Sequence, residues 1–271
     1  MIELYIFILG SCIGSFLNVC VYRLPRDLSV VRPRSFCPSC ARLIRWYDNI
    51  PIVSFLLLKG RCRFCQRMIS FRYMMVEIST AFLAIGVYKW GSWRHWDGLQ
   101  IALAMGITFA LLVVSLIDLE YFIIPNEITY LGVILGVGLS ILFPEMHMEK
   151  WPLWGLLKSL LGVFLGGGSL FLVGWLAKLM MKKEAMGLGD VKLMAMVGSF
   201  LGWKAALISI MIASIVGSLI GVYFVATKKL HFESRLPFGP FLSLGTFVYL
   251  LWGDILVRWY SGLIFDFTMP H

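Results

Sequence analysis

Long apolar segments separated by short polar connections restrict this chain to a membrane fold. Eight segments of at least 16 residues are apolar enough to cross a bilayer as helices, which takes about 20 such residues. With only 14% charged residues and a mean hydropathy of +0.84, the chain is predicted to be an all-α polytopic membrane protein with about eight transmembrane helices. The predicted spans are 2–20, 72–89, 99–117, 127–143, 153–178, 188–203, 205–226 and 237–258.

Basic side chains are concentrated in the polar segment 23–73. It holds two acids and eleven basic residues: Arg23, Arg26, Arg32, Arg34, Arg42, Arg45, Lys59, Arg61, Arg63, Arg67 and Arg72. Positive loops stay in the cytoplasm, so we expect this segment inside and the N-terminus outside. Topology and contact with anionic membrane lipid explain the net charge of +9, and nucleic acid is not an expected partner. The first span begins with Glu3 and no basic residue, which predicts a retained helix rather than a cleaved signal peptide.

Composition divides the chain into three predicted parts. Residues 1–22 form the first transmembrane helix, and residues 72–271 form a seven-helix transmembrane domain. Between them, residues 23–71 form a small, polar cytoplasmic domain that carries four of the six cysteines.

Those four cysteines form two C-x2-C pairs, Cys37 with Cys40 and Cys62 with Cys65, separated by 21 residues. This spacing is typical of a four-thiolate zinc site, and the reducing cytosol favours metal binding over disulfides. A domain of about 50 residues has little core, so Zn²⁺ would supply folding energy and be structural. The alternatives are four unligated cysteines or two redox pairs. Cys12 and Cys20 lie in the first span and are interpreted as packing residues.

Two aspartates lie where apolar spans meet a polar edge. Asp118 ends the third span and Asp190 begins the sixth, which places both at the cytoplasmic face in the predicted topology. An ionisable group at such a position indicates a functional site. Two carboxylates, one ionised and one protonated, can hydrolyse a peptide bond. Gly187 and Gly189 before Asp190 leave room for an extended substrate. Alternatively, Asp118 ends its helix and Asp190 is an N-cap.

The segment Gly187-Leu188-Gly189-Asp190 resembles the signature of the GxGD intramembrane aspartyl proteases. Three further segments resemble the bacterial type IV prepilin peptidases, also called leader peptidase/N-methyltransferases, and the likeness runs from residue 10 to about 245. They are Gly14-Ser15-Phe16-Leu17-Asn18-Val19 with Tyr22-Arg23-Leu24-Pro25, Tyr47-Asp48-Asn49-Ile50-Pro51 through Gly60-Arg61-Cys62, and Pro237-Phe238-Gly239-Pro240. Asn126, after Ile124-Pro125, is a departure, because many members are expected to carry an acid there.

The resemblance implies a bacterial inner-membrane enzyme with its active site at the cytoplasmic face. It would cleave the basic leader of prepilins and of type II secretion pseudopilins, with Asp118 and Asp190 as the catalytic pair. It would then methylate the new N-terminal amine from S-adenosylmethionine. Components of pilus or type II secretion assembly would be further partners. No Gly-rich cofactor fingerprint marks a site for the methyl donor.

Five further residues are assigned alternative roles. Lys192 either stabilises a carboxylate or reaches lipid head groups. Pro237 and Pro240 either free backbone groups that bind the peptide or simply kink the start of the last span. Gly60 and Glu77 are candidates for cofactor binding. Alternatively, Gly60 is a glycine required by the turn of the zinc site, and Glu77 pairs with an arginine such as Arg72.

Three other functions compete with this interpretation. A proton-coupled transporter would use the aspartates as proton carriers, although transport sites usually lie at the bilayer midplane between repeats. The chain could also be a non-catalytic assembly factor, or a peptidase without methyltransferase activity.

Overall fold

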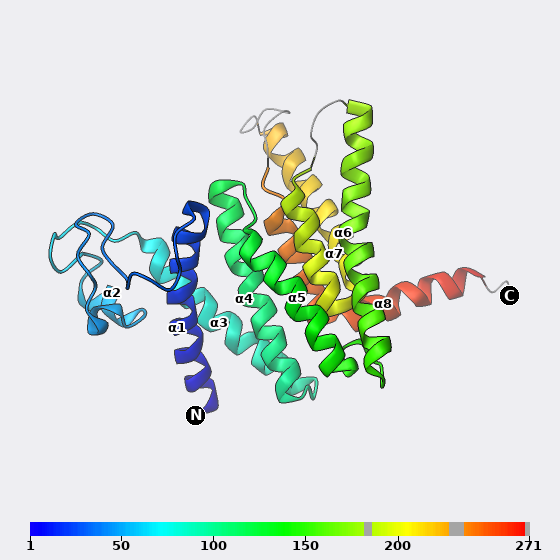
Figure 1. Cartoon of the computed structure of the whole chain (residues 1–271), viewed down its shortest axis with the longest axis horizontal. Coiled ribbons are helices and arrows are strands. Elements are labelled where there is room, and N and C mark those ends of the chain that lie inside the picture. The colour runs from blue at the N-terminus through cyan, green and yellow to red at the C-terminus, as the bar shows by residue number, and fades with distance from the viewer. Residues whose placement is uncertain (182–185, 228–235, 269–271) are drawn as a thin grey trace. The chain divides into compact units, whose positions relative to one another are not determined.

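The computed structural model describes residues 1–181, 186–227 and 236–268, and Figure 1 shows their elements. The α-helices are α1 (Ile2–Arg23), α2 (Val53–Leu57), α3 (Phe71–Trp93), α4 (Gly98–Tyr121), α5 (Asn126–Leu142), α6 (Pro152–Met181), α7 (Leu188–Ala226) and α8 (Gly239–Thr268). Three short 3₁₀ helices are η1 (Leu24–Arg26), η2 (Trp46–Asn49) and η3 (Pro144–His147). The described residues form no β-strand, only two isolated β-bridges.

Most of these helices have the length and composition of membrane spans. Within the described residues, six qualify: Ile2–Arg26, Phe71–Trp93, Gly98–Tyr121, Pro152–Met180, Leu188–Ala226 and Gly239–Trp259. The shorter helix Asn126–Leu142 is also apolar. The predicted all-α, multi-pass membrane protein is therefore confirmed.

The predicted sixth and seventh spans are joined in one 39-residue helix, α7, which is broken at Gly202. Gly202 has φ +80° and ψ 173°, a backbone conformation that interrupts a helix and suits glycine. A Cβ built on Gly166 of α6 would lie 2.5 Å from the Met194 carbonyl oxygen and 2.9 Å from the Ala206 Cβ. A straight helix would separate Met194 and Ala206 by about 18 Å. Because one point of α6 touches both, α7 folds back on itself at Gly202.

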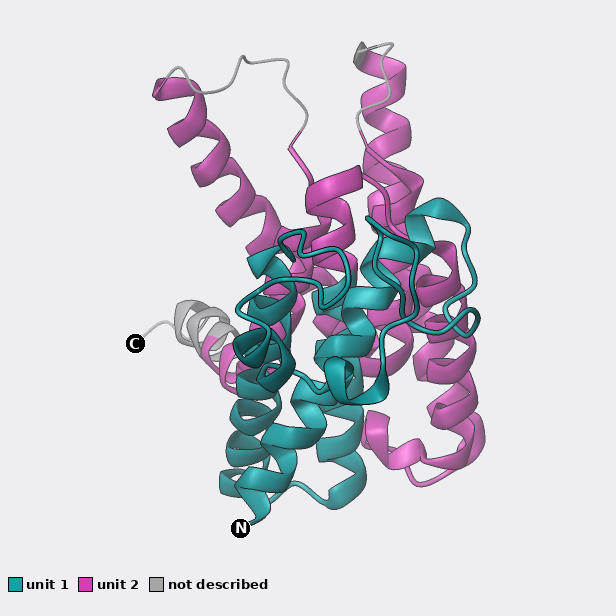
Figure 2. Ribbon diagram, turned by 90° about the vertical axis from the view of Figure 1, so that its left-hand side faces the viewer, with its two compact units in different colours: residues 1–113 teal, residues 114–271 magenta. Residues whose placement is uncertain are grey.

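The chain divides into two compact units, Met1–Val113 and Val114–His271, coloured teal and magenta in Figure 2. In unit 1, α1 packs closely on α3 through two glycines. A Cβ on Gly10 would lie 2.8 Å from the Ala81 Cα, and one on Gly14 would lie 2.7 Å from the Glu77 Cα. Small residues at these positions let the two backbones approach, as is common between membrane helices.

In unit 2, α7 packs against α5, α6 and α8. Gly162 of α6 and Gly198 of α7 meet backbone to backbone, and a Cβ on either would collide with the other's carbonyl group. The Ser159 hydroxyl donates to the Ser199 carbonyl across the same interface, at 2.9 Å. The first arm of α7, which carries Asp190, is thus packed closely against α6.

His147, in η3, is a buried histidine beside the α7 break. Its Nδ1 lies 3.6 Å from where a Cβ on Gly202 would be, and its side chain hydrogen-bonds to the Ser199 backbone. Burial lowers the pKa of His147 below its usual 6.5, partly opposed by that hydrogen bond. As the pH falls, His147 therefore becomes protonated in the unfolded chain before it does so in the folded protein. The free energy of unfolding that neutral, buried His147 supports above pH 6.5 is lost as the pH falls below that value.

We expect the melting temperature in detergent to fall between pH 7.5 and 5, and the advantage of the wild type over His147→Gln to shrink over the same interval. His95→Gln, which changes an exposed histidine, is the matched control. A constant difference between wild type and His147→Gln at every pH would contradict the assignment.

Candidate functional site

Asp118 lies near the end of α4 and is 5% exposed. Its Oδ2 accepts a hydrogen bond of 2.8 Å from the backbone N–H of Gly239 at the start of α8. A Cβ on Gly239 would lie 2.7 Å from that oxygen, so a larger residue would push the carboxylate away. Because α4 continues to Tyr121, Asp118 is not the residue that ends its helix.

Asp190 lies in the first turn of α7 and is 8% exposed. The helix begins at Leu188 with Gly187 as its N-cap, so Asp190 is not itself the N-cap. The Asp190 amide donates to the Gly187 carbonyl at 3.2 Å. Gly187 is exposed, whereas Gly189 is packed against Ile124: a Cβ on Gly189 would lie 2.9 Å from the Ile124 Cβ.

The two aspartates belong to unit 2 and come from different helices, α4 and α7. Their carboxyl groups are close enough to interact electrostatically. Two like charges placed close together disfavour each other, so a pair of buried carboxyl groups can hold one proton between them. This is the protonation state that acid–base hydrolysis of an amide requires.

The prolines around Gly239 explain why its N–H is free to bind Asp118. Pro237 precedes α8, and Gly239 is the first residue of the helix, where backbone N–H groups have no partner within the helix. Pro240, the second residue, has no N–H and fits the first turn. The amides of Phe241 and Leu242 both donate to the Phe238 carbonyl at 3.1 Å. The segment therefore presents one amide to the carboxylate.

Lys192 makes a contact that the sequence did not predict. Its Nζ donates to the Oδ1 of Asn126 at 2.8 Å and lies 4.9 Å from the centre of the Tyr130 ring. Asn126, the departure from the family pattern, therefore binds a lysine that follows Asp190 by two residues.

In unit 1, the four cysteines of the C-x2-C pairs come together. The sulfur atoms of Cys37, Cys40, Cys62 and Cys65 all lie within 4.8 Å of one another, and those of Cys37 and Cys65 are 3.8 Å apart. The six cysteines, all within the described residues, form no disulfide. The cluster has the donor set and the spacing of a metal site.

Both pairs sit in the same local structure, repeated 25 positions further along the chain. Cys37 donates its amide to the Arg42 carbonyl, and Cys62 donates to the Arg67 carbonyl, both at 2.9 Å. The isolated bridges Phe36–Leu43 and Arg61–Met68 close the two turns. We call these turns the first knuckle (residues 35–44) and the second knuckle (residues 60–69).

Gly60 opens the second knuckle with φ +66°, a conformation that favours glycine. Its carbonyl accepts the Ile69 amide at 2.7 Å, and a Cβ on it would lie 3.1 Å from the Phe55 ring. This geometry supports the turn-glycine interpretation.

An ion pair ties the second knuckle to η2. The Arg63 guanidinium binds both carboxylate oxygens of Asp48, at 2.6 to 3.1 Å. The hydrogen bond from Arg63 lowers the pKa of Asp48, and the charges of Arg63 and Arg45 add to the effect. Such a two-point pair fixes geometry as well as charge.

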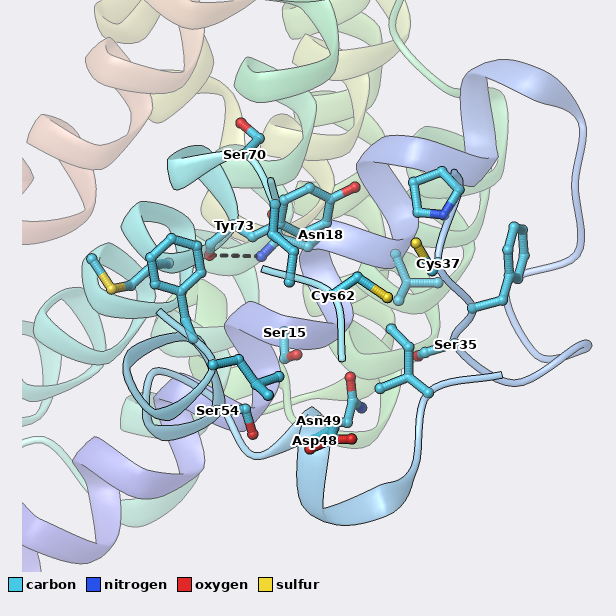
Figure 3. A pocket seen from close by; sticks show the side chains of 18 of the residues that line it. Ser15, Asn18, Ser35, Cys37, Asp48, Asn49, Ser54, Cys62, Ser70 and Tyr73 are labelled. Atoms are coloured by element: carbon cyan, nitrogen blue, oxygen red, sulfur yellow. Dashed lines mark hydrogen bonds between the residues drawn. The ribbon is translucent and has the colours of Figure 1, made fainter. Parts of the chain in front are cut away.

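Unit 1 also contains a half-open cavity of about 700 Å³, lined by α1, α3 and the knuckles. Figure 3 shows polar side chains around it, including Asn18, whose Nδ2 donates to the Tyr73 carbonyl at 3.0 Å. Glu77 lines this cavity and is 8% exposed. Its Oε2 accepts the Ile52 amide at 2.8 Å, and Ser15 also hydrogen-bonds to it. The cavity thus contains a buried carboxylate held by two neighbours.

Sequence reasoning did not single out Gly239, Ile124, Ser15 or Asn18. Gly239, Ser15 and Asn18 lie in segments that resemble the family, and Ile124 lies two residues before Asn126, where the chain departs from it. That resemblance is the one sequence signal that points to these four residues. What each one contacts could not be deduced from those segments.

Comparison with known proteins agrees with this arrangement. Residues 8–90 match the family model described as the bacterial peptidase A24 N-terminal domain, and residues 105–222 match that of the type IV leader peptidase family. A prepilin leader peptidase/N-methyltransferase of Pseudomonas putida is 34% identical over 91% of this chain and 89% of its own. This chain belongs to the type IV leader peptidase family.

Two further relatives with the same description support the membership. The protein of Pseudomonas aeruginosa is 34% identical over 93% of this chain and 91% of its own length. The protein of Myxococcus xanthus is 36% identical over 82% of this chain and 63% of its own length. The leader-peptidase match includes both aspartates, and the N-terminal match includes both knuckles. No solved structure matches the chain.

Proposed function

We propose that this chain removes the leader peptide of prepilins and then methylates the new N-terminal amine. The observation that carries the proposal is the buried pair Asp118 and Asp190, held close together within a multi-pass membrane protein of this family. Membership of the family favours this activity over a proton-coupled transporter.

In the proposed cleavage, one aspartate is ionised and the other carries the shared proton. The ionised carboxylate removes a proton from water as the water oxygen attacks the scissile carbonyl carbon. The protonated carboxyl group donates its proton to the carbonyl oxygen. As the tetrahedral intermediate collapses, the C–N bond breaks and the leaving nitrogen takes up the proton that came from water. One hydroxyl group of the intermediate returns its proton to the other aspartate, so the pair again holds one proton. The Gly239 N–H holds Asp118 in place during these steps.

The residues around the pair are proposed to admit and place the peptide. Gly187 is exposed beside Asp190 and leaves space for an extended backbone. Pro237 and Pro240 fix the start of α8 next to Asp118. Lys192 adds a positive charge that Asn126 orients. These contacts support a role in placing an extended peptide beside the pair.

We propose the bacterial inner membrane as the location, with the N-terminus outside and the active site at the cytoplasmic face. The basic segment 23–73 supports this orientation. Residues 1–22, 23–71 and 72–271 would be the first helix, the cytoplasmic domain and the peptidase domain. Pseudopilins of type II secretion are proposed as further substrates, and assembly components of either system as partners.

Zn²⁺ is the proposed metal of the four-cysteine cluster. Four thiolates about 2.3 Å from a tetrahedral Zn²⁺ lie about 3.8 Å apart, close to the separations of the sulfur atoms here. Cys37, Cys40, Cys62 and Cys65 would fill the coordination sphere, so the ion would be structural. It would join the two knuckles, which also meet where the Arg42 guanidinium lies 5.1 Å from the centre of the Phe64 ring.

The cavity of unit 1 is the proposed site for S-adenosylmethionine. Its volume is in the range of small-molecule sites, and it combines aromatic surface with charged groups of both signs. The carboxylate of Glu77 suits a ligand that carries positive charge. Gly60 is proposed to act indirectly, because it shapes the turn beside Phe55, which lines the cavity. The bound donor would supply an electrophilic methyl group to the new amine.

Mass spectrometry of a prepilin incubated with this protein in membranes tests both activities. With S-adenosylmethionine, we expect loss of the leader and a gain of one methyl group; without it, loss of the leader alone. Glu77→Gln is expected to keep cleavage and to lower methylation at least about tenfold, the cost of about 1.4 kcal/mol of lost interaction.

Glu3→Gln, at an exposed carboxylate of α1 that pairs with Lys89, is the matched control and should change neither activity. Cleavage without methylation by the wild type would leave a peptidase only. An unchanged prepilin, processed in parallel by a relative, would overturn the proposed function.

A further inference from the structure

The position of Asp190 is determined partly from outside α7. The short connection between α4 and α5 carries a branched side chain, Ile124, which packs directly against Gly189, the residue before Asp190. We propose that Ile124 is a positioning residue, which sets the place of the Asp190 carboxyl group relative to Asp118 by packing on Gly189. This inference rests on the proposed role of the two aspartates.

The connection starts from the other aspartate. The Phe122 amide donates to the Asp118 carbonyl at 3.0 Å, and Phe122 has φ +56°, so the chain turns sharply as α4 ends. Pro125 is buried and is the N-cap of α5. Ile124 lies between these two points and is half-buried. One short segment therefore begins at the turn that follows Asp118 and reaches the turn that carries Asp190.

A second contact holds the same two elements together. Asn126, two residues after Ile124, accepts the hydrogen bond from Lys192. Gly189 and Lys192 lie on either side of Asp190 in sequence, so the connection and the first residue of α5 together touch the first turn of α7 before and after the aspartate. Contacts on both sides restrict movement of this turn along the connection and rotation about its axis.

Gly189 leaves no room for a side chain at this contact. A Cβ there would lie 2.9 Å from the Cβ, 3.3 Å from the Cγ1 and 3.5 Å from the Cδ1 of Ile124. The nearest atom is the branching carbon, which moves only with the backbone, and β-branched side chains have a restricted χ1. A methyl group on Gly189 would therefore push the first turn of α7 away from the connection. Catalytic geometry is sensitive to such shifts, and about 1 Å can cost a factor of 10² in rate.

A double-mutant cycle in the full-length protein tests the proposal. Gly189→Ala should lower kcat for prepilin cleavage about 10²-fold, with a much smaller change in KM. Ile124→Gly alone should lower kcat a few fold. The double variant Gly189→Ala/Ile124→Gly should recover at least about tenfold over Gly189→Ala, because glycine removes the Ile124 Cβ that lies 2.9 Å from the new methyl group. The width of the pH profile of kcat should change in Gly189→Ala and return in the double variant, since it reports the interaction between the carboxyl groups.

Gly138→Ala is the matched control, since a Cβ there meets nothing within 4 Å. Gly138→Ala should cleave like the wild type on its own, and like the Ile124→Gly single variant when the two changes are combined. A double variant as slow as Gly189→Ala would overturn the proposal, because Gly189 would then be needed for substrate access or backbone freedom. Full activity of Gly189→Ala would overturn it too. Activity of Asp190→Asn would instead remove the proposed function on which the inference rests.

Discussion

Replacing either Asp118 or Asp190 with asparagine is expected to abolish prepilin cleavage, with a loss of at least about 10³-fold in kcat. An amide neither removes a proton from water nor donates an acidic one, and loss of such a group typically costs 10²- to 10⁴-fold. Asparagine keeps the size of the side chain, and at position 118 its oxygen still accepts the Gly239 N–H. The fold should therefore survive, and leader processing in membranes, read by mass spectrometry, checks the result.

The double variant Asp118→Asn/Asp190→Asn should be no slower than either single variant, because residues that act as a unit are not additive. Asp254→Asn is the matched control: Asp254 lies on α8, fifteen residues beyond Gly239, and pairs with Arg258 at 3.4 Å. It should keep full activity. Cleavage by either single variant at more than about a tenth of the wild-type rate would remove that aspartate from the proposed mechanism.

The second large effect is expected at the four-cysteine cluster. Purified protein should contain one Zn²⁺ per chain, and replacing Cys37 or Cys62 with serine should remove it. Structural zinc sites supply about 10 to 16 kcal/mol of apparent binding energy in zinc-finger peptides, more than a domain of this size gains from its small core. The knuckles should then unfold, and limited proteolysis should cut within residues 35–69.

Methylation should be lost with the metal, because both knuckles line the proposed donor cavity. Cleavage should be less affected, since both aspartates belong to unit 2. Cys20→Ala, which changes a buried cysteine of α1 outside the knuckles, should retain the zinc. Metal-free wild-type protein that resists the protease as well as the zinc-loaded form would contradict a structural ion.

Both the knuckles and the aspartates could be predicted because their signals are local. The C-x2-C spacing itself places two ligands on one turn, and the structure brings the two turns together. Asp118 and Asp190 stand out because an ionisable group is costly at the edge of an apolar span. Neither prediction needed knowledge of how distant parts of the chain pack.

The sequence predicts which segments form helices better than it predicts how consecutive helices are joined. The apolar run from 188 to 226 was divided into two spans at residues 203–205, close to the observed break at Gly202. Length alone required a break, but only the positive φ of Gly202 shows where it lies. Nothing in the local sequence distinguishes Gly202 from the glycines that sit inside regular helix, such as Gly198.

The contacts that refine the candidate site could not be predicted. Gly239 reaches Asp118 across 121 positions of sequence, and Lys192 reaches Asn126 across 66. Such pairs are set by how helices pack, which periodicity and composition do not encode. The same holds for Ile124 and Gly189, where the glycine was interpreted as space for substrate but is also filled by a neighbouring side chain.

The short helices of unit 2 have a consequence for the surrounding lipid. α5 has 17 residues, about 26 Å, and the first arm of α7, from Leu188 to the break at Gly202, measures about 21 Å. Both fall short of a hydrocarbon layer about 30 Å thick. Where such helices meet lipid, the bilayer thins, flanking side chains extend to the head groups or chains associate, each at a cost of a fraction of a kcal/mol per ångström. The thickness of the surrounding bilayer is therefore expected to influence the stability of the unit that carries both aspartates.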